Sequence, residues 1–156
     1  MVDLKAYSER MSNILTTFKY VNHGGCGVVA LELTRQFDKL GVDYSIHIAY
    51  YLNDEYEVIK AIKEAIKDDS VRHLKYINWV HVVLKVGDYY FDSNGLTIGY
   101  DNSGVEKGFE VNICQYPITK RLLDKLIKSG TWNDVFFNHH KCSDVKKFIR
   151  EKVFLK

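Results

Sequence analysis

Residues 81–95 read HVVLKVGDYYFDSNG, and this stretch decides the fold. Two runs rich in β-branched and aromatic residues are separated by Gly87 and Asp88, a pair typical of a two-residue hairpin turn. With that turn, Val86 lies opposite Tyr89, which sets the register of both strands. The sequence therefore predicts an antiparallel β-hairpin.

Side chains alternate along the two strands and divide the hairpin into two faces. The mixed face holds His81, with Asn94 directly opposite and Asp92 on the diagonal. A carboxylate or amide beside an imidazole fixes its tautomer and supports the imidazolium ion. A polar cross-strand cluster on a half-exposed sheet is the alternative interpretation. The other face is mostly apolar and predicted to pack on the core; it comprises Val82, Leu84, Val86, Tyr89, Phe91 and Ser93.

Outside the hairpin, the spacing of apolar residues predicts helices and further strands. Most predicted helices lie at the two ends of the chain and the strands lie in the middle, which is an α+β arrangement with a central antiparallel sheet. The predicted helices cover residues 2–19, about 26–40, 54–67, 118–129 and 143–151, and the further strands cover 42–52, 96–100 and 109–116.

Two of these helices carry distinct boundary signals. Gly41 ends the helix over 26–40 as a C′ residue. Asp54 is placed to cap the helix over 54–67. The buried stripe predicted for that helix consists of Val58, Ile59, Ile62 and Ile66.

Length and composition are those of one soluble globular domain spanning residues 1–156. Apolar residues make up 46% and charged residues 27% of the chain, and the net charge is +2. These values exclude a disordered chain and give no reason to expect a nucleic-acid or membrane partner. The three cysteines are an odd number, and the polar N-terminus lacks a secretory signal. We therefore expect free thiols and a cytoplasmic location.

Cys26 is the most informative single residue. It stands where a glycine-rich segment, NHGGCG at 22–27, meets the start of a predicted helix. Helix N-termini favour a thiolate, and the glycines allow a substrate and backbone amides to approach the sulfur. A small buried cysteine with glycines for tight packing is the alternative.

Cysteine at a helix start, histidine on a strand and a carboxylate or amide on the next strand follow one another in the chain. A thiol nucleophile, its base and the residue that orients the base require these three groups. Cys26, His81 and either Asp92 or Asn94 are therefore the candidates. The order of these residues in the chain does not give the distances between their side chains.

The motifs HGGCGVVALEL (23–33) and HVVLKVGDYYFDSNG (81–95) resemble the papain-like cysteine peptidase superfamily. The resemblance is strongest to small phage and bacterial members of the NlpC/P60-like and transglutaminase-like branches. It implies a papain-like fold, with Cys26 as nucleophile, His81 as base and Asp92 as the orienting residue. Aromatic-Asp-x-x-Gly at the strand end favours Asp92 over Asn94. Together with a composition rich in Lys, Tyr and Asn, the resemblance also suggests a phage or bacterial origin.

The chain departs from the superfamily pattern because no glutamine precedes Cys26 to act as oxyanion donor. Tyr20, Asn22 and His23 are the available donors, and Asn22 is preferred on chemical grounds. We expect a thiol hydrolase acting on an amide or isopeptide bond of a protein or peptide, without a cofactor. A transglutaminase or acyltransferase with the same triad, and a non-catalytic phage-type binding or inhibitor protein, are the alternatives.

Three other histidine-containing segments have simpler interpretations. The segment NHHKC at 138–142 invites a zinc site together with Cys114, but it lacks metal-ligand spacing, and no metal is expected. His47 is predicted to be a structural histidine that shares a strand face with Ser45. His73 is predicted to be exposed.

Overall fold

The structure is a computed structural model of the whole chain. Three residues of the predicted N-terminal helix are described, and Ala6, Tyr7 and Arg10 are all helical; the rest of that prediction lies outside the described residues. The described residues are 6, 7, 10, 26–75, 77, 81–87, 89–92, 95–98, 113–129 and 142–153.

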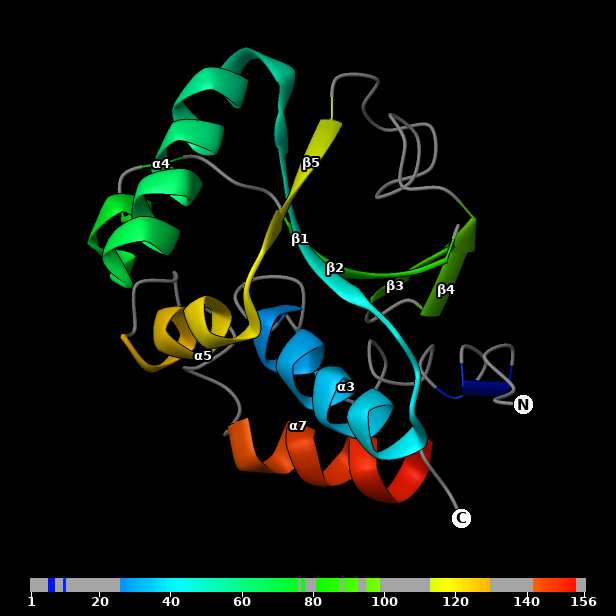
Figure 1. Cartoon of the computed structure of the whole chain (residues 1–156). Coiled ribbons are helices and arrows are strands. Elements are labelled where there is room, and N and C mark those ends of the chain that lie inside the picture. The colour runs from blue at the N-terminus through cyan, green and yellow to red at the C-terminus, as the bar shows by residue number, and fades with distance from the viewer. Residues whose placement is uncertain are drawn as a thin grey trace.

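The described strands form one antiparallel sheet in the order β4-β3-β2-β1-β5 (Figure 1). The central hairpin has the predicted register, since Val86 pairs with Tyr89 and Leu84 with Phe91. Gly87 in its turn has φ +61°, a conformation that glycine adopts without strain. The strands are β1 (Ser45–Tyr51), β2 (His81–Val86), β3 (Tyr89–Asp92), β4 (Gly95–Ile98) and β5 (Ile113–Ile118).

The α+β class is confirmed, with helices that begin and end close to the predicted positions. Gly41 ends the first of them with φ +69°, as its sequence context indicated. Two short 3₁₀ turns, η1 and η2, flank α4 and were not predicted. The segments are α3 (Cys26–Leu40), η1 (Leu52–Asp54), α4 (Glu55–Asp68), η2 (Val71–Leu74), α5 (Lys120–Lys128), α7 (Cys142–Phe148) and the π-helical turn η3 (Ile149–Val153).

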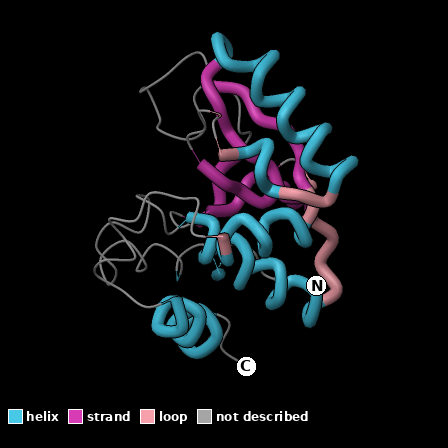
Figure 2. The backbone as a smooth tube through the Cα atoms, turned by 90° about the vertical axis from the view of Figure 1, so that its left-hand side faces the viewer, coloured by secondary structure: helices cyan, strands magenta, loops and turns pink. Residues whose placement is uncertain are grey.

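Helix α3 lies between the sheet and α7, as both views show (Figure 1, Figure 2). One side of α3 packs on β2 and β3. There the rings of Phe37 and Phe91 meet edge to face, with 5.6 Å between their centres. The other side packs on α7 and η3, which contribute Val145 and Ile149 to the same core. Because it is covered on two sides, α3 buries polar residues as well, among them Glu32.

Helix α4 lies beside β1 and β5 and corrects two predictions. Its buried stripe consists of Val58, Ala61, Ile62 and Ala65. Ile66 was expected in that stripe, but its side chain is 45% exposed. The prediction weighted large apolar residues, whereas the two alanines let α4 approach its neighbours closely. Asp54 does occupy the N-cap position, but its side chain makes no capping hydrogen bond.

Candidate active site

Cys26 is the first residue of α3, and its side chain is only 6% exposed. It belongs to the core cluster between α3 and the sheet, which also contains Val82 and Leu84 of β2. The described part of α3 spans 15 residues and begins at this cysteine. The glycine-rich segment before it, with the candidate oxyanion donors Asn22 and His23, lies outside the described residues.

His81 is the first residue of β2 and is 4% exposed. It pairs with Ala49 of β1. Asp92 is the last residue of β3 and pairs with Gly95 of β4. The pairing of β2 with β3 ends at Leu84 and Phe91, so the position of Asp92 diagonal to His81 stays a prediction. Asn94, the alternative orienting residue, lies outside the described residues.

The chain topology brings the start of α3 and the start of β2 to the same end of the molecule. Helix α3 leads through residues 41–44 into β1, which runs in the opposite direction (Figure 1). Strand β2 is antiparallel to β1 and therefore runs in the same direction as α3. Cys26 and His81 are the first residues of these two parallel elements.

The contact between Phe37 and Phe91 allows the positions of Cys26 and His81 along the shared direction of α3 and β2 to be compared. This is possible because Phe91 pairs with Leu84 of β2. From Phe37 back to Cys26 is about 16 Å along the helix. From Leu84 back to His81 is about 10 Å along the strand. The two candidates therefore differ by about 6 Å in level along their common direction.

The two candidates nevertheless belong to opposite faces of the sheet by alternation. Val82 and Leu84 face α3, whereas Val83, which alternates in step with His81, forms a second cluster with Ala49 and Tyr90. A contact between the Cys26 sulfur and the His81 imidazole thus has to be made around the start of β2. It cannot be made through the middle of the sheet.

The second face of the sheet carries a hydrogen-bonded polar cluster. Ser45 Oγ lies 2.7 Å from His47 Nε2, and His47 Nδ1 is hydrogen-bonded to Gln115 Oε1. The Gln115 amide nitrogen donates to the Tyr90 hydroxyl at 2.8 Å, which directs its oxygen toward His47. Nδ1 therefore carries the ring proton, and Nε2 accepts from Ser45. Lys85, opposite Ser45, places its ammonium 5.7 Å from the centre of the Tyr90 ring.

This cluster confirms that His47 is a structural histidine that shares a face with Ser45. Its other partners were not predicted. Gln115 is 68 residues away from His47 in the chain, and only the pairing of β5 with β1 brings them together. The predicted strand over 109–116 was the one signal that could have suggested it.

His47 makes stability depend on pH. Burial lowers its pKa from the ordinary value of 6.5, and the hydrogen bond to Gln115 opposes that effect. The folded chain then binds a proton less readily than the unfolded chain, so stability is lost as pH falls below about 6.5. We expect the Tm to fall between about pH 7.5 and 5.5, and to fall less in His47→Gln. Thermal unfolding followed by circular dichroism checks this. Equal decreases in both proteins would show that another group causes the loss.

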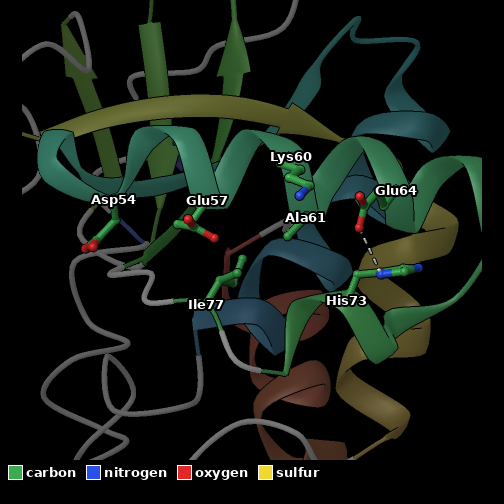
Figure 3. A pocket seen from close by; sticks show the side chains of 7 residues that line it. All are labelled: Asp54, Glu57, Lys60, Ala61, Glu64, His73 and Ile77. Atoms are coloured by element: carbon green, nitrogen blue, oxygen red, sulfur yellow. Dashed lines mark ion pairs between the residues drawn. The ribbon is translucent and has the colours of Figure 1, made fainter.

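A separate hollow of about 280 Å³ lies between α4 and η2 (Figure 3). His73 of η2 points toward Glu64 of α4, with 3.2 Å between Nδ1 and the carboxylate, and its Nε2 lies 2.8 Å from Asp68. The prediction that His73 is exposed is therefore wrong, because it is half-buried between two carboxylates. These contacts link η2 to α4. The residues lining the hollow are Asp54, Glu57, Lys60, Ala61, Glu64, His73 and Ile77, and none is a candidate catalytic residue.

Among the described residues, no group of three or more His, Cys, Asp or Glu side chains is gathered in a way that could hold a metal ion. None of the described helices has the length and apolar character needed to cross a membrane. Most of the segment at 138–142 lies outside the described residues. Comparison with models of known protein families, with curated proteins and with solved structures found no match.

Proposed function

We propose that the chain is a papain-like thiol hydrolase that cleaves an amide or isopeptide bond of a protein or peptide. Cys26 is the nucleophile, His81 the base and Asp92 the orienting residue. The observation that carries the proposal is that Cys26 and His81 begin two elements that run in the same direction, with a difference of about 6 Å between their positions along it. Asp92, on the strand next to His81, supplies the third group.

In the first half of this reaction, the Cys26 sulfur attacks the carbonyl carbon and forms a C–S bond. The thiol proton passes to His81 and then to the nitrogen of the leaving amine as the C–N bond breaks. The backbone amide of Cys26 and the side chain of Asn22 bind the oxyanion.

In the second half, a water molecule gives a proton to His81 and attacks the thioester. The C–S bond then breaks, the carboxylic acid leaves, and the proton returns to sulfur. If a primary amine takes the place of water, the product is a new amide, which is the transglutaminase or acyltransferase outcome.

A binding protein without catalytic activity is the second candidate. It is favoured by the burial of Cys26 and by large exposed side chains around α4, such as Leu52 at 47% and Tyr56 at 73%. Contiguous patches of exposed apolar residues mark contact surfaces. This candidate requires that Cys26 has no more reactivity than an ordinary buried thiol.

Acyl transfer from p-nitrophenyl acetate tests the proposed function without knowledge of the natural substrate. We expect an acetyl group on Cys26, seen by mass spectrometry, and steady release of p-nitrophenol as water regenerates the thiol. Cys26→Ala should abolish this release, and His81→Ala should lower it by about 10²–10⁴-fold.

The matched control is Cys114→Ala, which removes another free thiol and should leave the rate unchanged. Added hydroxylamine or a primary amine distinguishes the two enzyme classes, because a transferase would give the amide faster than the acid. Equal acetylation of Cys26 and Cys114 would contradict both enzyme classes and leave the binding protein.

A further inference from the structure

Helix α4 presents an exposed stripe that crosses its outward side. Tyr56 is 73% exposed and Ile66 is 45% exposed, while Ile59 between them is half-buried. Charged residues lie at both ends and beside the centre. We define the α4 stripe as Glu55, Tyr56, Ile59, Lys63, Ile66 and Lys67.

The charges of the α4 stripe differ from those on the adjoining flank of the same helix. On that flank, Glu64 and Asp68 are paired with His73, and Asp68 also with Arg72. Within the described part of the chain, the charged residues of the stripe, Glu55, Lys63 and Lys67, form no ion pair. Lys63 and Lys67 are four residues apart, so their like charges weaken the isolated helix.

The α4 stripe is complementary to itself in the antiparallel direction. When two copies of α4 are antiparallel and centred on Ala61, residues at equal distances on either side of Ala61 lie opposite each other. Tyr56 then lies opposite Ile66, and Glu55 opposite Lys67. Ile59 lies opposite Lys63, whose alkyl stem covers apolar surface. At 100° per residue the same pairs are symmetric about one line on the helix surface, so they meet in a two-fold contact.

An open hollow is lined by Glu55, Tyr56, Ile59, Lys60, Lys63 and Glu64. In the antiparallel pairing the partner's Ile66 falls on this hollow. The partner's Lys63 and Lys67 then flank Glu55, which supplies the counter-charge that the isolated chain lacks.

We propose that the chain forms a two-fold symmetric homodimer through the α4 stripe, with the two α4 helices antiparallel. A single helix pair buries less than the roughly 1,000 Å² typical of stable complexes, so the dimer belongs to the weak, transient class. Its charged ends set the direction and register of pairing, and they make association sensitive to salt.

Sedimentation equilibrium of the full chain between about 10 μM and 1 mM tests the dimer. At low salt the average mass should rise with concentration from 18.2 kDa toward twice that value, and 1 M NaCl should reduce the rise. Glu55→Lys alone and Lys63→Glu/Lys67→Glu alone should each remain monomeric. Mixing the two variants should restore dimers, because each chain then supplies the charge that the other lacks.

The matched control is Glu57→Lys, which makes the same charge change on the same helix but outside the α4 stripe. It should dimerise like the unmodified chain. Circular dichroism and thermal unfolding establish that each variant is folded before it is compared. The proposal is overturned by a chain that stays monomeric to about 1 mM. It is equally overturned if Glu57→Lys disrupts the dimer as much as Glu55→Lys, or if mixing the two variants restores nothing.

Discussion

At pH 6, iodoacetamide should alkylate Cys26 at least about tenfold faster than Cys114, and His81→Ala should remove this advantage. Only the thiolate reacts, and the proposed pairing with His81 supplies a base that takes the proton of the Cys26 thiol. Cys114 provides the internal comparison, because burial and the nearby Glu55 carboxylate raise the pKa of its thiol. Labelling across about pH 4–9 with site mapping by mass spectrometry measures both rates.

The matched control for His81→Ala is His47→Ala. Both histidines are buried in the same sheet, at 4% and 8% exposure, but only His81 begins the strand that runs in the same direction as α3. If His47→Ala slows the labelling of Cys26 as much as His81→Ala does, the effect is a loss of structure. If Cys26 reacts only after urea unfolds the chain, Cys26 is a core cysteine and the search turns to binding partners.

The hairpin could be predicted from the sequence because all its determinants are local. The glycine at the turn and the alternation on either side fix which residues pair, and Val86 does pair with Tyr89. The same reasoning located α3 and its end at Gly41. Helix α4 was located equally well, yet its buried face was partly missed, since Ala61 and Ala65 pack inward and Ile66 does not. Close packing selects small residues that an apolarity pattern undervalues.

The candidate site depends on relations between distant segments, which the sequence does not encode in a readable way. Alternation correctly separated His81 from Val82, but it did not show that α3 would cover the Val82 face. The packing of α3 on the Val82 face places Cys26 and His81 on opposite sides of β2. A contact between their side chains is then possible only around the first residue of the strand. The partnership of His47 with Gln115 is of the same kind. Such contacts follow from sheet order, which no single segment determines.

The largest loss of stability should follow from Phe37→Ala. Phe37 is fully buried. The centre of its ring lies 6.2 Å from the centre of the Tyr44 ring and 5.6 Å from the centre of the Phe91 ring. Removing a phenylalanine ring from a packed core costs about 3–5 kcal/mol, because the transfer energy is lost and a cavity remains. In a chain of this length that corresponds to a fall in Tm of about 10 °C. Urea unfolding and calorimetry measure both quantities.

Two further substitutions separate the packing of Phe37 from general effects of losing an aromatic ring. Tyr56→Ala removes a ring of similar size that is 73% exposed, and it should change stability by less than about 0.5 kcal/mol. Phe37→Leu keeps most of the buried volume and should lose about 1.5 kcal/mol or less. A loss below 1 kcal/mol for Phe37→Ala would mean that α3 does not rest on β3 through this ring. The offset of Cys26 from His81 along α3 and β2 was counted from the contact between Phe37 and Phe91. Without that contact, the proposed meeting of the Cys26 sulfur and the His81 imidazole would lose its geometric basis.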